Sequence, residues 1–133
     1  MERLNRRLAL ARQALSTLQE LTSLPQPSRV ERDAAIQRFE YTAEACWKAA
    51  QAVLDTRFGV ALTSPKPVVR ACTQNGLIKE SDGYAAMAMI DDRKLTSHTY
   101  NEDLALAIHA RLGGHAALIE RWLTALEQAA NEA

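Results

Sequence analysis

The sequence has few of the residues that interrupt helices or build extended strands. It contains five glycines and four prolines, and aromatic side chains occupy only 5% of its positions. Alanine and leucine dominate its hydrophobic residues, and both favour helices, whereas strands are rich in β-branched and aromatic residues. The composition therefore predicts an all-α fold. At 133 residues the chain is long enough to bury a core, so we expect residues 1–133 to form a single helical domain.

The sequence also has only two cysteines and no net charge. Cys46 and Cys72 stand alone without CxxC spacing, which favours two buried thiols in a reducing compartment over disulfides. Sixteen basic and sixteen acidic side chains cancel. A neutral chain does not attract nucleic acid by its bulk charge, so any contact with RNA must be local.

No long hydrophobic run is present, which argues against a membrane span and a membrane partner. The first seven residues contain no apolar signal-peptide core, so we expect a cytoplasmic protein. His98, His109 and His115 are not spaced to share one helix face. We therefore expect no metal site and no cofactor.

Hydrophobic periodicity predicts the first helix at about residues 2–22. Its apolar face carries Leu4, Leu8, Ala11, Leu15 and Leu18. The opposite face carries Arg3, Arg6, Arg7 and Arg12. These arginines form either a solvated surface or a contact for a partner or RNA.

Capping signals delimit the next three helices. Ser28 and Glu31 form a capping box that opens a long helix, and Gly59 follows its end at Phe58. Ser64 caps a short third helix that begins at Pro65 and stops at Asn75–Gly76, and a fourth helix starts at 81–83.

The last helix is expected from about Tyr100 to Ala129, with Thr99 and Glu102 forming its capping box. Gly113–Gly114 should interrupt it and cause a bend. Short joints between these helices predict an up-and-down four-helix bundle with one short extra helix.

Residues 91–102 hold most of the reactive side chains of the chain. On the helix boundaries above, Arg93 lies in the last turn of one helix, His98 at the bend and Tyr100 in the first turn of the next. A guanidinium, an imidazole and a phenol can then converge at one corner. Such a pair of arginine and histidine at a helix joint can also be purely structural.

Arg93, His98 and Tyr100 match the Arg-x4-His-x-Tyr signature of HEPN domains. The chain resembles most the HepT-like branch, also called nucleotidyltransferase substrate-binding proteins. Further segments of the likeness lie at 38–42, 47–48, 64–65, 76–78 and 95–102. The resemblance implies a HEPN-like bundle, usually a dimer with a composite cleft between its two copies.

The residues suit RNA cleavage without a metal. A base removes the proton of the 2′-hydroxyl, and a cation stabilises the phosphorane that forms. Histidine titrates near neutrality, so His98 suits the base, and Arg93 suits the phosphate. Protonation of the leaving oxygen needs a second acid, which a two-fold dimer supplies. We therefore expect a homodimer through the fourth and fifth helices.

The resemblance gives Tyr100 a different task. HepT-like proteins are encoded with a minimal nucleotidyltransferase that transfers AMP to the tyrosine of the motif. AMP on Tyr100 would add negative charge and bulk beside His98. The chain would then be a toxin, and the nucleotidyltransferase its antitoxin.

Several neighbours are candidates for support of this site. Glu40 and Glu44 can place a carboxylate beside Arg93, or Glu44 can simply pair with Lys48 on the surface. Lys94 stands where HEPN nucleases usually carry Asn, Asp or His and keeps a positive charge there. Ser97 and Asn101 complete the polar set.

Three functions remain open from the sequence. The first is an endoribonuclease toxin silenced by its nucleotidyltransferase. The second is a non-catalytic subunit that binds substrate for that enzyme or serves as its substrate. The third is a helical adaptor with no connection to nucleotides.

Overall fold

The computed structural model describes residues 2–132, and in this range it contains five α-helices and no strand, which confirms the predicted all-α class. A 3₁₀ turn, η1, separates the last two helices. The helices in chain order are α1 (Glu2–Thr22), α2 (Arg29–Phe58), α3 (Pro65–Gln74), α4 (Glu80–Leu95) and, after η1 (Thr96–His98), α5 (Glu102–Asn131).

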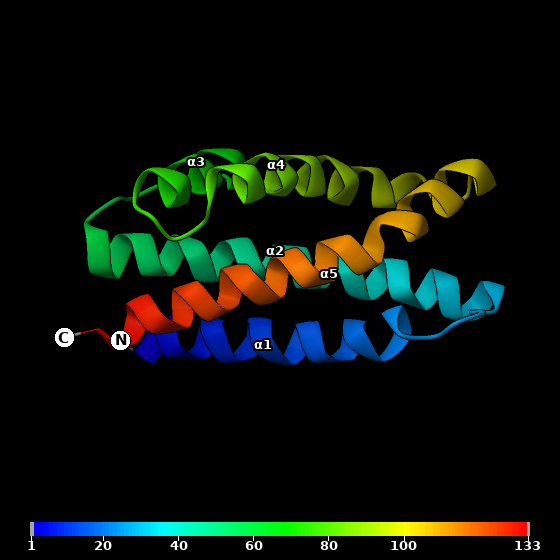
Figure 1. Ribbon diagram of the computed structural model, residues 1–133, viewed down its shortest axis with the longest axis horizontal. Helices are drawn as coiled ribbons and strands as arrows, with labels where there is room; N and C mark the ends of the chain where they lie inside the picture. Colours follow the sequence, from blue (N-terminus) through cyan, green and yellow to red (C-terminus); the bar gives the residue numbers. More distant parts are fainter. Residues whose placement is uncertain (1, 133) are drawn as a thin grey trace.

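The helices pack side by side with their long axes nearly aligned (Figure 1). α1 and α2 run antiparallel, α5 lies against both, and α3 and α4 form a second layer over α2. One continuous core fills the space between them, and its largest fully buried side chains include Trp122, Phe39, Leu15, Leu54 and Ile108. The N- and C-terminal ends lie at one end of the bundle. The joint between α1 and α2 and the turn η1 lie at the other.

Local signals set the ends of α2 as predicted. The backbone N–H of Glu31 donates to the Ser28 hydroxyl at 3.1 Å, and the Ser28 N–H donates to the Glu31 carboxylate at 2.8 Å. Gly59 ends the helix in the left-handed conformation, at φ 66°, where glycine has no steric cost.

Other boundaries differ from the predictions. Ser64 precedes α3 without a capping hydrogen bond, and α4 begins at Glu80, before the expected 81–83. α5 continues as one α-helix through Gly113 and Gly114, so the expected interruption is wrong. Both glycines face solvent, and the helix withstands their low propensity because the opposite side of α5 is packed against the core.

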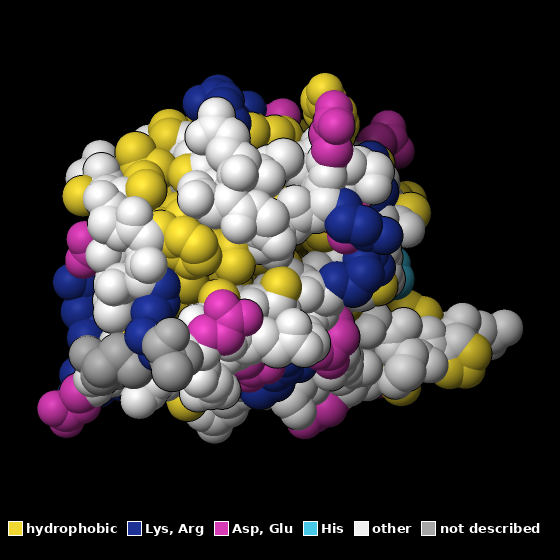
Figure 2. All heavy atoms as spheres, turned by 60° about the vertical axis from the view of Figure 1, so that its left-hand side comes forward, with side chains coloured by type: hydrophobic (Ala, Val, Ile, Leu, Met, Phe, Trp, Pro, Cys, Tyr) yellow, Lys and Arg dark blue, Asp and Glu magenta, His cyan; other side chains and the backbone are white. Residues whose placement is uncertain are grey.

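The surface carries no dominant charge. On the face shown in Figure 2, basic side chains occur in small groups with acidic side chains close by, which fits the zero net charge of the sequence. Within residues 2–132, no helix has the length and apolar character needed to cross a membrane.

Candidate functional site

The corner between α4 and α5 is closed by hydrogen bonds that the sequence only partly predicts. Asn101 is the N-cap of α5, and its side chain accepts from the backbone N–H of Leu104 at 3.1 Å. Thr99 does not cap the helix, and its hydroxyl instead donates to the carbonyl of Thr96 at 3.2 Å. Tyr100 therefore lies in the turn before α5, two residues earlier than the helix begins.

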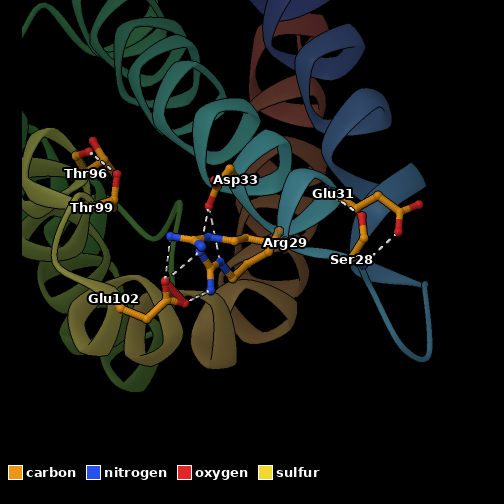
Figure 3. Close-up of polar contacts among 8 residues, drawn as sticks. Ser28, Arg29, Glu31, Asp33, Thr96, Thr99 and Glu102 are labelled. Carbon is orange, nitrogen blue, oxygen red and sulfur yellow. Dashed lines mark hydrogen bonds and ion pairs between the residues drawn. The ribbon is translucent and has the colours of Figure 1, made fainter.

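Glu102 is drawn away from its expected capping position by two arginines from the start of α2 (Figure 3). Its carboxylate is paired with Arg32, and Arg29 approaches it at 3.2 Å. The Arg32 side chain is almost fully buried and also contacts Asp33 at 3.0 Å. The hydrogen bond from Arg32 holds the pKa of Glu102 below its usual value. This ion cluster fastens the start of α5 to the start of α2.

His98 and Tyr100 are the two exposed rings of the corner. Tyr100 is 86% exposed, and its ring meets that of His98 edge-on, with 6.1 Å between the ring centroids. In the part of the chain that the structure describes, neither the His98 ring nitrogens nor the Tyr100 hydroxyl has a hydrogen-bond partner. Both groups are therefore accessible to a macromolecule or a nucleotide.

Arg93 points from α4 towards α2, where it binds Glu44 with 2.9 Å between guanidinium nitrogen and carboxylate oxygen. The same carboxylate accepts a hydrogen bond from Trp47 at 3.0 Å and lies 3.4 Å from the ammonium of Lys48. Both contacts considered for Glu44 in the sequence thus occur together. The Nε of Arg93 is buried without a hydrogen-bond partner among residues 2–132.

A second carboxylate, that of Glu40, ties α2 to the 3₁₀ turn. It accepts a hydrogen bond from the buried hydroxyl of Thr96 at 2.8 Å, and this hydroxyl also lies 2.7 Å from the carbonyl of Arg93. Among residues 2–132, the Ser97 hydroxyl makes one hydrogen bond, to the carbonyl of Lys94 at 3.4 Å. Glu40 therefore helps to position the turn that carries His98.

The predicted site residues fall into two groups. Arg93 and Glu44 form one, and His98 and Tyr100 form the other. No hydrogen bond or ion pair within residues 2–132 joins Arg93 to His98. Lys94 and Arg93 line a hollow of about 190 Å³ beside the first group, together with Trp47, Pro65 and Ile90.

A third polar cluster was missed in the sequence. Asp92 is 6% exposed and receives two hydrogen bonds of 2.7 Å from Arg111 and one contact of 2.7 Å with Nε2 of His115. The His115 ring also stacks on Phe39, with 5.1 Å between centroids. Burial alone would raise the pKa of Asp92, but the bonds from Arg111 and His115 outweigh it and hold this pKa below its usual value. The spacing of four between Arg111 and His115, on one face of a helix, was the available signal.

This cluster joins three helices, since Asp92 lies in α4, Arg111 and His115 in α5, and Phe39 in α2. Because Asp92 precedes Arg93 in the sequence, these contacts fix the orientation of α4 about its own axis at the position of Arg93. Within the described residues, no group of three His, Cys, Asp or Glu side chains has the arrangement of a metal site.

Comparisons with other proteins agree on the architecture. The profile of a family described as nucleotidyltransferase substrate binding protein like matches residues 6–128. A comparison with proteins of curated function gives no match.

Among solved structures, one from Thermus thermophilus is 53% identical, with a TM-score of 0.85 over 87% of this chain and 98% of that chain. A Haemophilus influenzae protein described as the substrate binding domain of a nucleotidyltransferase is 25% identical, with a TM-score of 0.76 over 91% and 99% of the two chains. A tri-AMPylated Shewanella oneidensis HEPN toxin, solved with its MNT antitoxin, is 17% identical, with a TM-score of 0.72 over 94% and 96%. At that identity the last likeness concerns the fold alone.

Proposed function

The chain belongs to the family of nucleotidyltransferase substrate binding proteins, and from this premise we propose that it is the HEPN half of a toxin–antitoxin pair, with a minimal nucleotidyltransferase as its partner. Tyr100 is the acceptor of AMP in this proposal. Arg93 and His98 act on RNA. The fold is shared with a HEPN toxin that carries AMP in complex with its antitoxin, which supports a partner of this kind.

The observation that carries the proposal is the exposure of Tyr100 beside His98. Tyr100 is 86% exposed, and its hydroxyl has no hydrogen-bond partner within residues 2–132. An enzyme can therefore reach the hydroxyl without unfolding the corner. In the transfer, the phenolic oxygen attacks the α-phosphorus of ATP. The bond from that phosphorus to pyrophosphate breaks, and the phenolic proton passes to solvent.

Modification at this place would silence the neighbouring histidine. The AMP group adds about one negative charge and a bulky base within reach of the His98 ring. RNA is repelled by the charge and excluded by the bulk. Tyr100 is thus the regulatory residue of the proposed site, and His98 the residue that it regulates.

For RNA cleavage, His98 takes the proton of the 2′-hydroxyl, the oxygen attacks the adjacent phosphorus, and the bond to the 5′-oxygen breaks. Arg93 leaves Glu44 to bind the phosphate. The leaving oxygen takes a proton from the second histidine of a homodimer, so that the products are a cyclic phosphate and a free 5′-hydroxyl.

The exposed surface of α5 supports such a dimer. Leu106 is 51% exposed, and the exposed side of α5 continues with small residues that allow close approach of another helix. These are Ala110, Gly113, Gly114 and Ala117. The expected result is a dimer in sedimentation equilibrium at micromolar concentration, and a monomer would remove the shared-site mechanism.

The AMP transfer is tested by mass spectrometry after incubation with the nucleotidyltransferase and ATP. We expect one or more adenylyl groups on the wild-type chain and none on Tyr100→Phe. Tyr84→Phe is the matched control, since Tyr84 is 72% exposed on α4 and lies outside the corner. Equal modification of wild type and Tyr100→Phe would refute the assignment.

A second function, a non-catalytic subunit of the nucleotidyltransferase, is favoured by the ion pair between Arg93 and Glu44. Arg93 is already held by a carboxylate at 2.9 Å, so a nuclease has to break this pair before Arg93 binds phosphate, whereas a non-catalytic subunit does not. The Haemophilus influenzae structure is described as a substrate binding domain, which fits the same alternative. Expression of the chain alone separates the two functions: growth arrest that His98→Ala relieves indicates the nuclease, and normal growth with the wild type indicates the subunit.

A further inference from the structure

A groove runs along α1 and α2 on the side of the bundle that leads to Arg93. Two adjoining hollows of about 350 Å³ and 290 Å³ share Leu10, Tyr41 and Ala45. The first extends towards Thr17, and the second reaches Lys48 and Arg93. We call these two hollows together the α1–α2 groove. Each is comparable in size to small-ligand pockets, which begin at about 300 Å³.

The wall of the groove is an exposed apolar surface. Leu10 is 59% exposed and Tyr41 is 43% exposed, although both sit on well-packed helices. The Tyr41 hydroxyl is hydrogen-bonded to the Thr17 hydroxyl at 2.6 Å, and Thr17 in turn donates to the carbonyl of Ala14 at 2.7 Å. The tyrosine ring is therefore held in place while much of its surface stays open.

The end of the groove at Lys48 is bordered by a fixed positive charge. The Arg7 guanidinium donates to the carbonyl of Lys48 at 3.2 Å and to the side-chain oxygen of Gln51 at 3.0 Å. Both acceptors are neutral, so these bonds hold Arg7 in place and no carboxylate balances its positive charge there. Burial, and to a smaller extent the charge of Arg3 one turn earlier, lower the pKa of Arg7.

Cations outnumber carboxylates along this path. The second hollow is lined by two cations, Lys48 and Arg93, and by two acids, Glu40 and Glu44. Arg7, bound to the carbonyl of Lys48, adds a third cation at its border. Glu44 is shared between Lys48 and Arg93, whereas Glu40 accepts a hydrogen bond from the neutral hydroxyl of Thr96 and keeps its negative charge. The groove thus combines an aromatic and aliphatic wall with an excess of one positive charge, which Arg7 supplies, whereas the chain as a whole is neutral.

We propose that the α1–α2 groove binds a single-stranded stretch of RNA and leads it to Arg93. An unpaired base lies against Leu10 and Tyr41, and the neighbouring phosphates lie on Arg7 and Lys48. Proteins that hold single strands use this combination, because every base has a face to stack and every nucleotide has a phosphate. The inference rests on the proposed RNA substrate and adds to it a requirement for unpaired bases upstream or downstream of the cut.

Binding is measured by fluorescence anisotropy with a labelled single-stranded oligonucleotide in a His98→Ala background, which prevents cleavage. Tyr41→Ala is expected to weaken binding about ten-fold or more, in line with the loss of one stacked base. Tyr84→Ala, which removes another exposed tyrosine outside the groove, should leave binding unchanged. Tyr41→Phe keeps the ring and should bind like wild type, which assigns the loss to the ring and not to the hydroxyl. The circular dichroism spectrum of Tyr41→Ala should match that of wild type, which excludes loss of folding as the cause.

The charge is tested by the salt dependence of the same binding. Arg7→Gln should reduce the slope of log affinity against log salt by about one, as for the loss of one phosphate contact. The control is Arg70→Gln, an exposed arginine on α3 that lines neither hollow. A duplex of the same sequence should bind more weakly than the single strand.

The outcomes separate this inference from the function proposed above. Equal effects of Tyr41→Ala and Tyr84→Ala, with cleavage that still depends on His98, would overturn the groove and leave the nuclease intact. Binding that depends on Tyr41, without any cleavage or AMP transfer, would support the groove and refute the nuclease. If Tyr41→Ala weakens binding of the nucleotidyltransferase and not of RNA, the groove is a protein docking site and the proposal is wrong.

Discussion

The histidines His115 and His98 lie in opposite environments only a few turns apart. His115 is 8% exposed, contacts Asp92 at 2.7 Å and stacks on Phe39. His98 is exposed, and within residues 2–132 its ring has no hydrogen-bond partner and only the edge of Tyr100 beside it. The buried ring holds three helices together, because a buried polar group is stable only with its partners. The exposed ring of His98 makes no hydrogen bond within residues 2–132, so its nitrogens are free to bind a substrate or take up a proton.

The same contrast divides two consecutive residues of α4. Asp92 turns towards α5 and is enclosed by Arg111 and His115, whereas Arg93 turns towards α2 and meets Glu44 at the surface of a hollow. The buried contacts of Asp92 with Arg111 and His115 set the orientation of α4 about its axis. This orientation directs the next residue, Arg93, towards Glu44 on α2.

The largest effect is expected from breaking the enclosed cluster. Arg111→Met should lower the free energy of unfolding by about 3 kcal/mol, because it leaves the carboxylate of Asp92 buried with one partner fewer. Arg121→Met is the matched control, since Arg121 also lies on α5 and makes two bonds to an α4 aspartate, Asp82, at 2.9 and 3.0 Å. That pair is more exposed and should contribute below about 1 kcal/mol.

Urea denaturation of the two variants checks this difference. The slope of unfolding free energy against urea should stay the same in both, because neither change alters the surface exposed on unfolding to any extent. Equal losses in the two variants would mean that the cluster around Asp92 is no more than another surface ion pair.

A smaller effect is expected from acid. The pKa of Asp92 is lower in the folded chain than in the unfolded chain, through its bonds to Arg111 and His115. Its contribution to stability is therefore fully present above the unfolded value, about 4, and is lost as the pH falls through the folded value. Asp92→Asn removes this titration.

Unfolding free energies between about pH 6 and pH 2.5 should accordingly decline less steeply in Asp92→Asn than in wild type. The other carboxylates with lowered pKa values, Glu31, Asp82, Glu102 and Glu120, keep titrating in both proteins and cancel in the comparison. Parallel curves would show that Asp92 titrates alike in the folded and unfolded states.

What could be predicted from sequence follows the range of the interactions involved. The capping box of Ser28 and Glu31 uses atoms three residues apart, and it forms as predicted. The similar pattern at Thr99 and Glu102 fails because Glu102 is captured by Arg32, which is 70 residues away. Local patterns cannot reveal a competitor that only the tertiary fold brings near.

The same limit applies to burial. Tyr84 is a large aromatic residue of α4 but is 72% exposed, because the small residue Gly83 occupies the buried position beside Thr73. Asp92 and His115 looked like ordinary polar residues in the sequence, and only the packing of α4 on α5 encloses them. The exposed corner with His98, by contrast, was located from its motif, and Glu44 was among the residues considered as partners of Arg93.

A gain in stability is expected from a substitution at Gly114, on the solvent-facing side of the turn of α5 that carries His115. Gly114 precedes His115, faces solvent, and a Cβ added there would meet nothing within 4 Å. Gly114→Ala should stabilise the monomer by about 1 kcal/mol through helix propensity. If this face packs against a second copy as proposed, the added methyl group should also weaken the dimer.

Thermal unfolding at low concentration and sedimentation equilibrium at high concentration measure the two effects separately. Gly76→Ala is the contrasting variant, because Gly76 has a φ of 74° and alanine there is strained despite the open space. Stabilisation by Gly114→Ala without any change in dimer affinity would remove this face of α5 from the interface.

The smallest effect on stability is expected at the corner itself. His98→Ala and Tyr100→Phe should change the free energy of unfolding by no more than about 0.5 kcal/mol, because neither side chain loses a hydrogen bond or a buried contact. His115→Ala, measured beside them, should lose several times as much through its contacts with Asp92 and Phe39. A loss at His98 as large as that at His115 would make the motif histidine a structural residue, whereas unchanged stability together with lost growth arrest would place its importance in function alone.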